Sequence, residues 1–186
     1  MTNTSKLDRA IWDEFYGDWD ELPLLSETLL AEKQQKSVEE LHGIDIENLP
    51  QGETREHIVK TRVNQGFFRS YILATYKNAC CITGLAQPEL LVAGHIRPWS
   101  LDEANRLNPR NGLAMNALHD KAFENGLITI TTDYQIVVAS TLLAQKKSAA
   151  IDTYFKPYHN KQINLPTKFF PDPEFLRYHR EERFQG

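Results

Sequence analysis

The sequence predicts an α+β fold, in which a small core of short strands and one short helix lies between helical segments. Two observations predict it. Short apolar runs separated by turn residues fill positions 79–140, whereas strong helix formers dominate the segments before and after them. The chain has 186 residues, of which 41% are hydrophobic and 25% charged, so it can bury a core of its own. No run of about 18 apolar residues occurs, which excludes a membrane-spanning helix.

Helix is expected on both sides of the strand-rich core. Leu7, Ile11 and Phe15 recur at four-residue intervals, and Gly43 is a typical stop after the helix formers that precede it. Near the C-terminus, Asp172 is a typical N-cap and Pro173 suits the first helical position. The predicted helices are residues 5–41, 54–78, 141–155 and 172–185.

The core is expected to fold as strands that lead into a helix and then into a hairpin. Strands are predicted at residues 79–84, 88–96 and 112–116, a helix at 117–125 that Gly126 ends, and a hairpin at 127–140. Residues 97–110 form a polar loop between the second and third strands. A loop of this length is more often functional than a simple connector.

Charge and cysteine content indicate the organisation and the compartment. Residues 1–53 carry 4 Lys/Arg and 13 Asp/Glu, a net −9, whereas the rest of the chain carries +5. We therefore predict an acidic helical N-terminal segment at 1–53, a core domain at 54–145 and a C-terminal helical extension at 146–186. The only cysteines, Cys80 and Cys81, are adjacent, which predicts reduced thiols in a cytoplasmic protein. The basic balance of the second part is compatible with a polyanionic partner.

Three residues of the core could form one site. His95 ends an apolar strand, Asn111 lies where the polar loop enters the next strand, and His119 lies on the short helix. A neutral imidazole at His95 could deprotonate water at pH 7, and His119 could anchor a divalent metal, the chemistry of phosphodiester hydrolysis. Asn111 could bond loop carbonyls and hold the end that carries His95. Each residue alone has a plain alternative: a structural histidine, a turn asparagine or a packed helix histidine.

The order His95, Asn111, His119 within "GHIRPW", "NPRNGL" and "NALHDKAFENGLITI" resembles the HNH nucleases, and specifically their restriction-endonuclease branch. The resemblance covers residues 65–140 well and 155–183 more weakly. It implies a ββα-metal core flanked by N-terminal helices and a C-terminal helix. It also implies a metal-dependent endonuclease that hydrolyses DNA, double-stranded by preference, in prokaryotic restriction or phage defence. Because duplex cleavage calls for two active sites, a homodimer is expected.

The resemblance also implies a role for each motif residue. His95 takes the general-base position, Asn111 the base-positioning position and His119 the metal-ligand position on the helix, with Asn116 on the same helical face as a candidate second ligand. Many HNH enzymes carry Asp directly before the base, and many carry CxxC pairs, whereas this chain has Gly94 and no CxxC. The metal would therefore have few protein ligands, which favours Mg²⁺, then Mn²⁺, over Zn²⁺.

Basic residues flank the three motif residues and could contact the phosphates of DNA, which receive most contacts in protein–DNA complexes. Each of them alone could equally be a solvated surface charge. They are Arg97, Arg106, Arg110 and Lys121. The histidines at 42, 57, 159 and 179 lack partners in sequence and are expected to be structural or on the surface.

A second function class remains open at this point. Because Gly94 cannot bind a metal, the chain could be an HNH-fold module that binds nucleic acid without cutting it. Cleavage of a plasmid in the presence of Mg²⁺ separates the two hypotheses.

Overall fold

The structure, a computed structural model, describes residues 21–45, 54–145 and 148–186, which form two compact units, Met1–Phe68 and Arg69–Gly186. The helix predicted around Leu7, Ile11 and Phe15 lies outside the described residues. The two units divide within one long helix, α4 (Arg55–Thr75). The domain boundaries predicted after residues 53 and 145 stay predictions.

The first unit contains α2 (Glu21–Gln34), α3 (Val38–His42) and the beginning of α4. The helix predicted up to Gly43 ends there, with Gly43 at φ +60°, but it is broken in the middle. The break arises because Gln35 has a φ of +55° and Ser37 starts a new helix with a capping box. Arg55 pairs with Glu39 at 2.6 Å, which ties α4 to α3.

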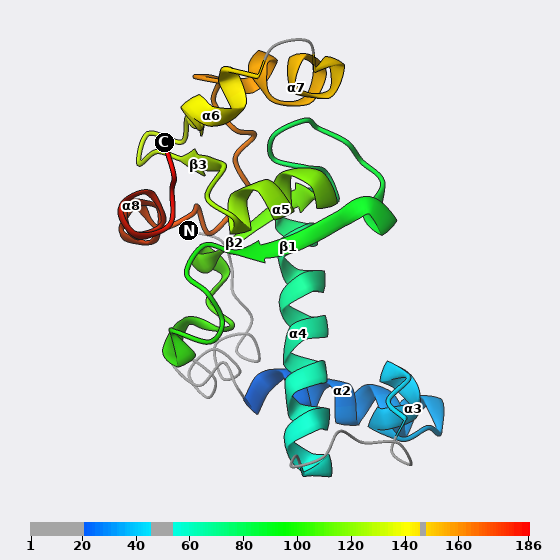
Figure 1. The fold of residues 1–186 in the computed structure, drawn as a ribbon. Coiled ribbons are helices and arrows are strands. Elements are labelled where there is room, and N and C mark those ends of the chain that lie inside the picture. Colours follow the sequence, from blue (N-terminus) through cyan, green and yellow to red (C-terminus); the bar gives the residue numbers. More distant parts are fainter. Residues whose placement is uncertain (1–20, 46–53, 146–147) are drawn as a thin grey trace, which may run out of the picture. The chain divides into compact units, whose positions relative to one another are not determined.

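The second unit is built around an antiparallel hairpin and the helix that follows it (Figure 1). Strand β1 (Leu91–His95) pairs with β2 (Gly112–Asn116), so that His95 lies opposite Gly112 and Leu91 opposite Asn116. Helix α5 (Ala117–Glu124) begins directly after β2 and packs on both strands. This ββα arrangement confirms the predicted core.

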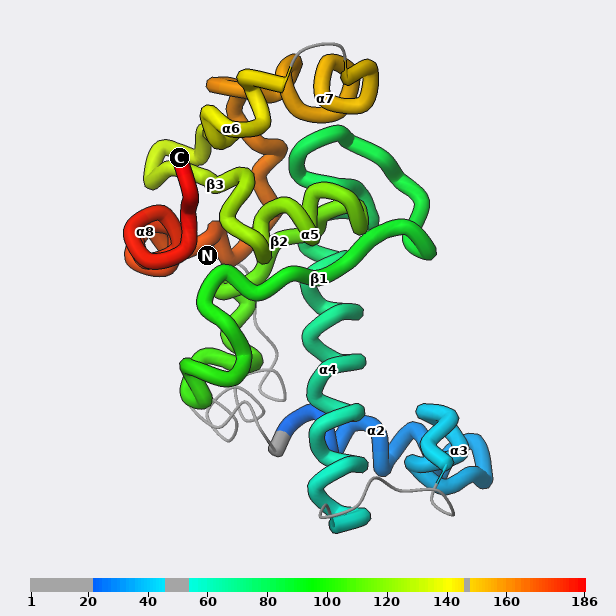
Figure 2. The backbone as a smooth tube through the Cα atoms, in the orientation of Figure 1, coloured from blue at the N-terminus to red at the C-terminus, as the bar shows by residue number. Residues whose placement is uncertain are grey.

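The connection from β1 to β2 contains two short 3₁₀ turns, η2 (Glu103–Asn105) and η3 (Pro109–Asn111), and Figure 2 lets its path be followed back to β2. A second hairpin, β3 (Ile128–Ile130) and β4 (Ile136–Val138), also lies where it was predicted. The remaining elements are η1 (Pro88–Leu90), α6 (Ser140–Leu143), α7 (Ala149–Tyr154), η4 (Lys156–Tyr158) and α8 (Pro173–Glu182).

The core of this unit forms because both hairpins direct apolar side chains inward. Leu113 and Met115 from β2, Ile128 and Ile130 from β3, and Leu176 from α8 are all completely buried. Burying side chains of this size contributes about 1.5–3 kcal/mol each. Helix α8 begins as predicted, with Asp172 accepting a hydrogen bond from the Glu174 amide and Pro173 at its first turn.

Two predictions of local structure are wrong. Residues 79–84 form a turn and not a strand: the Gly84 amide donates to the Cys80 carbonyl, and the Thr83 amide donates to Cys80 Sγ. This local pairing takes up backbone groups that a strand would need. The single helix predicted at 141–155 is instead the two short helices α6 and α7, the second of which Ser148 caps through its hydroxyl.

Candidate active site

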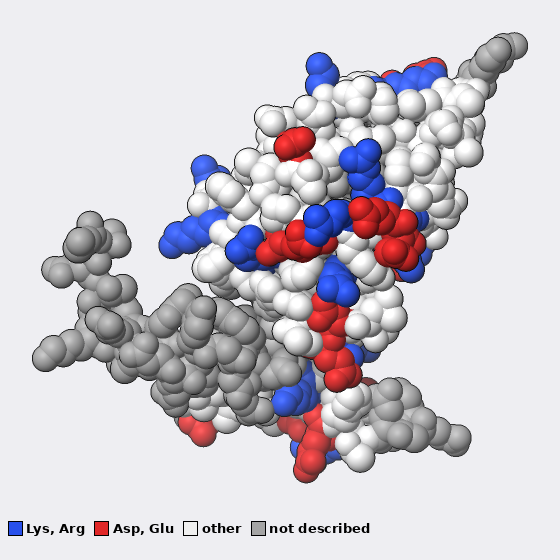
Figure 3. All heavy atoms as spheres, turned by 90° about the vertical axis from the view of Figure 1, so that its left-hand side faces the viewer, with Lys and Arg blue, Asp and Glu red and all other residues white. Residues whose placement is uncertain are grey.

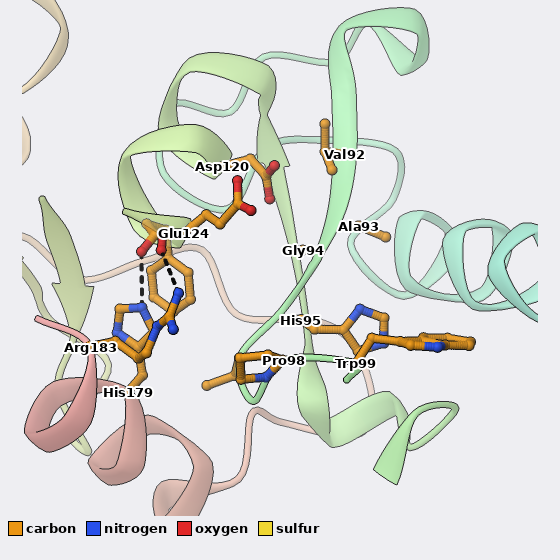
Figure 4. A pocket seen from close by; sticks show the side chains of 12 residues that line it. Val92, Ala93, Gly94, His95, Pro98, Trp99, Asp120, Glu124, His179 and Arg183 are labelled. Carbon is orange, nitrogen blue, oxygen red and sulfur yellow. Dashed lines mark hydrogen bonds between the residues drawn. The ribbon is translucent and has the colours of Figure 1, made fainter. Parts of the chain in front are cut away.

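His95 lies on one wall of a pocket of about 320 Å³ in the second unit (Figure 4). The pocket lies between the end of β1, helix α5, the start of the β1–β2 loop and the C-terminal part of α8. Beside His95, the lining includes Gly94, Trp99, Asp120, Glu124, His179 and Arg183.

The His95 ring is held so that its proton position is defined. Nε2 lies 2.8 Å from the Arg106 carbonyl oxygen, and the edge of Trp99 contacts the ring at a centroid distance of 5.4 Å. Because a carbonyl only accepts, a neutral ring donates from Nε2 and keeps its basic lone pair on Nδ1. Burial lowers the pKa of His95, although the bond to the Arg106 carbonyl opposes this. The ring is therefore neutral and able to accept a proton at pH 7.

Asn111 braces the loop that starts at His95. The residue is 1% exposed, its Oδ1 accepts from the Arg97 amide at 2.8 Å, and its Nδ2 donates to the carbonyls of Arg97 at 3.2 Å and Asn105 at 3.1 Å. Asn105 is followed directly by Arg106, whose carbonyl holds His95. The side chain of Asn111 thus connects both ends of the loop and fixes the chain around the imidazole.

His119 and Asn116 do not reach the pocket. His119 is 1% exposed and lies on the buried face of α5, with Nδ1 at 3.1 Å from Asn116 Oδ1 and Nε2 at 2.7 Å from the Tyr154 carbonyl oxygen. Asn116 Oδ1 also accepts from the His119 amide as the N-cap of α5. Both ring nitrogens thus lie within hydrogen-bonding distance of oxygen atoms of the protein. In this arrangement the two residues shape the start of α5 and lie outside the pocket that His95 lines, so their role as metal ligands stays a prediction.

His119 also lies against a thiol. Burial raises the pKa of Cys80, but hydrogen bonds from His119 and Thr83 outweigh it and bring the pKa to about 7. Cys80 Sγ accepts from the amides of Thr83 and Asn116 as well, so the thiol is part of the same buried network. The network explains why a polar histidine can be buried at the start of this helix.

Helix α5 contributes Asp120 and Glu124 to the pocket, two residues that were not among those predicted from the sequence. Figure 4 shows both carboxylates directed into the pocket above Gly94. A Cβ atom at Gly94 would collide with Asp120 Oδ1, so the absent side chain of Gly94 leaves the space that this carboxylate fills. The signal in the sequence was their spacing of four residues, which places two side chains on one helical face.

The pKa of Asp120 reflects its burial and the neighbouring charge of Glu124. Burial, and then the charge of Glu124, raise the pKa of Asp120, while Lys121 opposes the shift. A cation between the two carboxylates would relieve the repulsion. Among the described residues no three His, Cys, Asp or Glu side chains are grouped to hold a metal ion. Two carboxylates completed by water and phosphate oxygens suit Mg²⁺, which keeps several waters when it binds to proteins.

The four basic residues predicted to contact DNA lie outside the pocket lining, and each pairs with a carboxylate. Arg97 Nη1 lies 3.2 Å from Asp102, Arg106 Nη2 3.0 Å from Glu103, Arg110 Nη2 3.1 Å from Asp172, and Lys121 Nζ 2.7 Å from Glu124. On the face drawn in Figure 3, basic and acidic atoms accordingly alternate over the described part of the surface. The Lys121–Glu124 pair is exposed on both sides, and exposed pairs are worth about 0–1 kcal/mol, so a phosphate could replace that carboxylate at low cost.

The C-terminal segment contributes two further residues to the pocket, His179 of α8 and Arg183 directly after it. His179 is 2% exposed, stacks on Phe123 at 3.6 Å between centroids, donates from Nε2 to the Phe123 carbonyl at 3.0 Å, and accepts at Nδ1 from Thr129 Oγ1 at 2.9 Å. Burial lowers its pKa to about 4, so the ring is neutral. Arg183 follows one turn later and completes the wall of the pocket.

Comparison with known proteins agrees with the geometry of the site. Residues 80–131 match the family model HNH_2, described as HNH endonuclease. This segment contains β1, the loop, β2, α5 and β3, and thus His95, Asn111 and both carboxylates. No curated protein matches the chain. Among the described residues, no helix is both long and apolar enough to cross a membrane.

Proposed function

We propose that this protein is a metal-dependent endonuclease that hydrolyses phosphodiester bonds of DNA, because residues 80–131 match the HNH endonuclease family model. The observation that supports the proposal best is that His95, Asp120 and Glu124 all line one pocket. The first is a base for water, and the other two are oxygen ligands for a cation.

In this proposal His95 accepts a proton from the attacking water at Nδ1. The carbonyl of Arg106 holds the proton on Nε2, and Asn111 fixes the loop segment that carries this carbonyl. Orientation of the imidazole by a partner on its other nitrogen is a general device for setting the basic position. Trp99 packs on the same imidazole in a T-shaped arrangement.

Asp120 and Glu124 would hold the metal, with Mg²⁺ first and Mn²⁺ second in expected effectiveness. When bound there, a divalent cation would supply the positive charge that stabilises the transition state and the departing oxygen. Asp120 takes the space beside Gly94, so the helix would supply the carboxylate that many HNH enzymes carry on the strand. This arrangement favours cleavage over the alternative of a binding module that does not cut.

The finer features of the function rest on the resemblance of the motifs. The substrate is double-stranded DNA, the setting is prokaryotic restriction or phage defence in the cytoplasm, and two copies act together on a duplex. Arg97, Arg106, Arg110 and Lys121 contact flanking phosphates by exchanging their carboxylate partners for phosphate oxygens.

A plasmid-nicking assay with and without Mg²⁺, Mn²⁺ and EDTA tests the proposal. The wild type is expected to nick the plasmid with metal and to stop with EDTA. His95→Ala and Asp120→Asn are expected to be inactive. The control, Asp152→Asn at an exposed ion pair of α7, is expected to cut normally. DNA binding without cleavage under any metal condition would establish the binding-module alternative instead. Full activity of Asp120→Asn would remove the carboxylates from the mechanism.

A further inference from the structure

Arg183 lies at the pocket from outside the matched family segment, because it follows α8 at the C-terminal end of the chain. In Figure 4, Arg183 and His95 lie on opposite sides of Gly94, with Asp120 and Glu124 above. The pocket therefore has a base on one wall, two carboxylates on another and a guanidinium on a third. The family segment by itself accounts for the first two only.

The chain around Arg183 is fixed to the end of α5. Gln185 donates from its amide to the Gly126 carbonyl at 2.9 Å and from Nε2 to the Asn125 carbonyl at 3.0 Å, and the bond from His179 to the Phe123 carbonyl anchors the preceding turn. Gly126 has a φ of +69°, and a Cβ there would collide with the Arg183 carbonyl oxygen. This close approach of two backbones fixes the backbone of Arg183 beside the pocket.

The guanidinium of Arg183 has more N–H donors than its hydrogen bond to Glu124 uses. Arg183 Nη2 donates to the Glu124 carbonyl at 3.2 Å. This bond uses one of the five N–H donors of the group. The planar fork of the remaining donors matches two oxygens of a phosphate, which is why arginine is the preferred residue for bidentate phosphate contacts.

The formal charges of the pocket lining match one divalent cation together with one phosphodiester. Asp120 and Glu124 are negative, Arg183 is positive and the two imidazoles are neutral, so the lining carries a formal −1. A divalent cation would change this to +1, and one phosphodiester, which carries a single negative charge, would bring it to zero. Lys121 pairs with Glu124 at the exposed rim, where solvent screens its charge.

On these grounds we propose that Arg183 binds a non-bridging oxygen of the scissile phosphodiester. This inference rests on the proposed nuclease function and extends it, because it assigns part of phosphate recognition to the C-terminal extension. The plain alternative is that Arg183 only caps α5, since a cation near the last carbonyls of a helix is stabilising. The two explanations differ in whether Arg183 responds to an anion.

The first experiment measures phosphate binding directly. Inorganic phosphate is titrated into the ¹⁵N-labelled full-length protein with Mg²⁺ present, and the arginine Nε–H resonances are followed by NMR. The Arg183 signal, identified by its absence in Arg183→Gln, is expected to shift saturably. Arg180→Gln, which removes the same charge from an exposed position of α8, should leave that shift unchanged. An Arg183 signal that does not move in the folded protein overturns the inference.

The second experiment measures cleavage and separates this inference from the proposed function. Arg183→Gln is expected to reduce kcat/KM about 100-fold, as loss of a donor to a developing oxyanion does, and Arg183→Lys to recover only part of it. Thermal unfolding of both variants reports any loss of the cap. Phosphate binding at Arg183 in a protein that never cuts would refute the nuclease but keep the inference. Normal cleavage by Arg183→Gln would refute the inference but keep the nuclease.

Discussion

Replacing Asn111 with Ala is expected to lower the free energy of unfolding by about 3 kcal/mol. The side-chain amide makes three hydrogen bonds to the backbone, at 2.8, 3.2 and 3.1 Å. Because Asn111 is 1% exposed, water cannot replace these bonds for the backbone groups of Arg97 and Asn105. Each bond contributes about 1 kcal/mol net. A loss of this size multiplies the fraction of unfolded protein by roughly 100.

The loss can be measured by urea unfolding, in which a slope of about 2 kcal/mol per molar predicts a midpoint lowered by roughly 1.5 M. Hydrogen exchange at the Arg97 amide, which donates to Asn111 Oδ1, reports the local effect. Asn111→Asp should be no better than Ala, because it keeps the acceptor for Arg97 but turns an oxygen toward two carbonyls. Asn164→Ala, at an exposed position, serves as the control and should change stability by less than about 0.5 kcal/mol.

The reasoning would be refuted by Asn111→Ala protein that loses less than about 0.5 kcal/mol and still protects the Arg97 amide. That result would mean that the loop keeps its conformation without the hydrogen bonds of the Asn111 side chain. Loss of cleavage at full stability would be equally informative, because it would give Asn111 a role in the chemistry beyond holding the loop.

Four further predictions follow from the site. Gly94→Ala should cost about 1–3 kcal/mol of stability and reduce cleavage about 10–100-fold, because the new methyl displaces the Asp120 carboxylate. The loss of cleavage is measured by plasmid nicking at saturating Mg²⁺. Unchanged cleavage would contradict the placement of Asp120. The acid limb of the pH–rate profile should lie below pH 6.5, because the lowered pKa of His95 keeps the base unprotonated to lower pH; a midpoint at or above 6.5 would contradict it. His119→Ala should destabilise the fold by about 2–5 kcal/mol, since the ring is buried and both of its nitrogens are hydrogen-bonded. The metal affinity of the folded variant, measured by calorimetry, should be unchanged. A weaker metal affinity would show that His119 is a metal ligand. The free energy of unfolding should fall by about 3 kcal/mol as pH drops from 6.5 toward 4, because His179 is protonated in the unfolded chain, whereas its pKa in the folded protein is about 4. In His179→Gln this part of the pH dependence, measured by urea unfolding, should vanish.

Periodicity and local signals in the sequence were sufficient for most of the second unit. Short apolar runs predicted the strands of the first hairpin, alternating apolar residues predicted the second, and the Asp172–Pro173 pair predicted the start of α8, because these signals act over a few neighbouring residues. The prediction failed at residues 79–84, where apolar composition suggested a strand. There the Cys80 sulfur accepts backbone amides and closes a turn, a choice that composition does not reveal.

The motif by itself was sufficient to place His95 and Asn111 at the two ends of the loop, because the hairpin register fixes both positions, whereas their roles in catalysis stay predictions. Only the tertiary structure decided which face of α5 turns to the pocket: His119 and Asp120 are neighbours in sequence, yet about 100° of helical rotation separates them. Burial against Phe155 and Tyr158 takes His119 to one side, and this rotation delivers Asp120 and Glu124 to the other. His179 and Arg183 could not be predicted at all, since they are more than 50 residues from α5 in the chain. They reach the pocket because the end of α5 leaves carbonyl groups that the C-terminal segment satisfies.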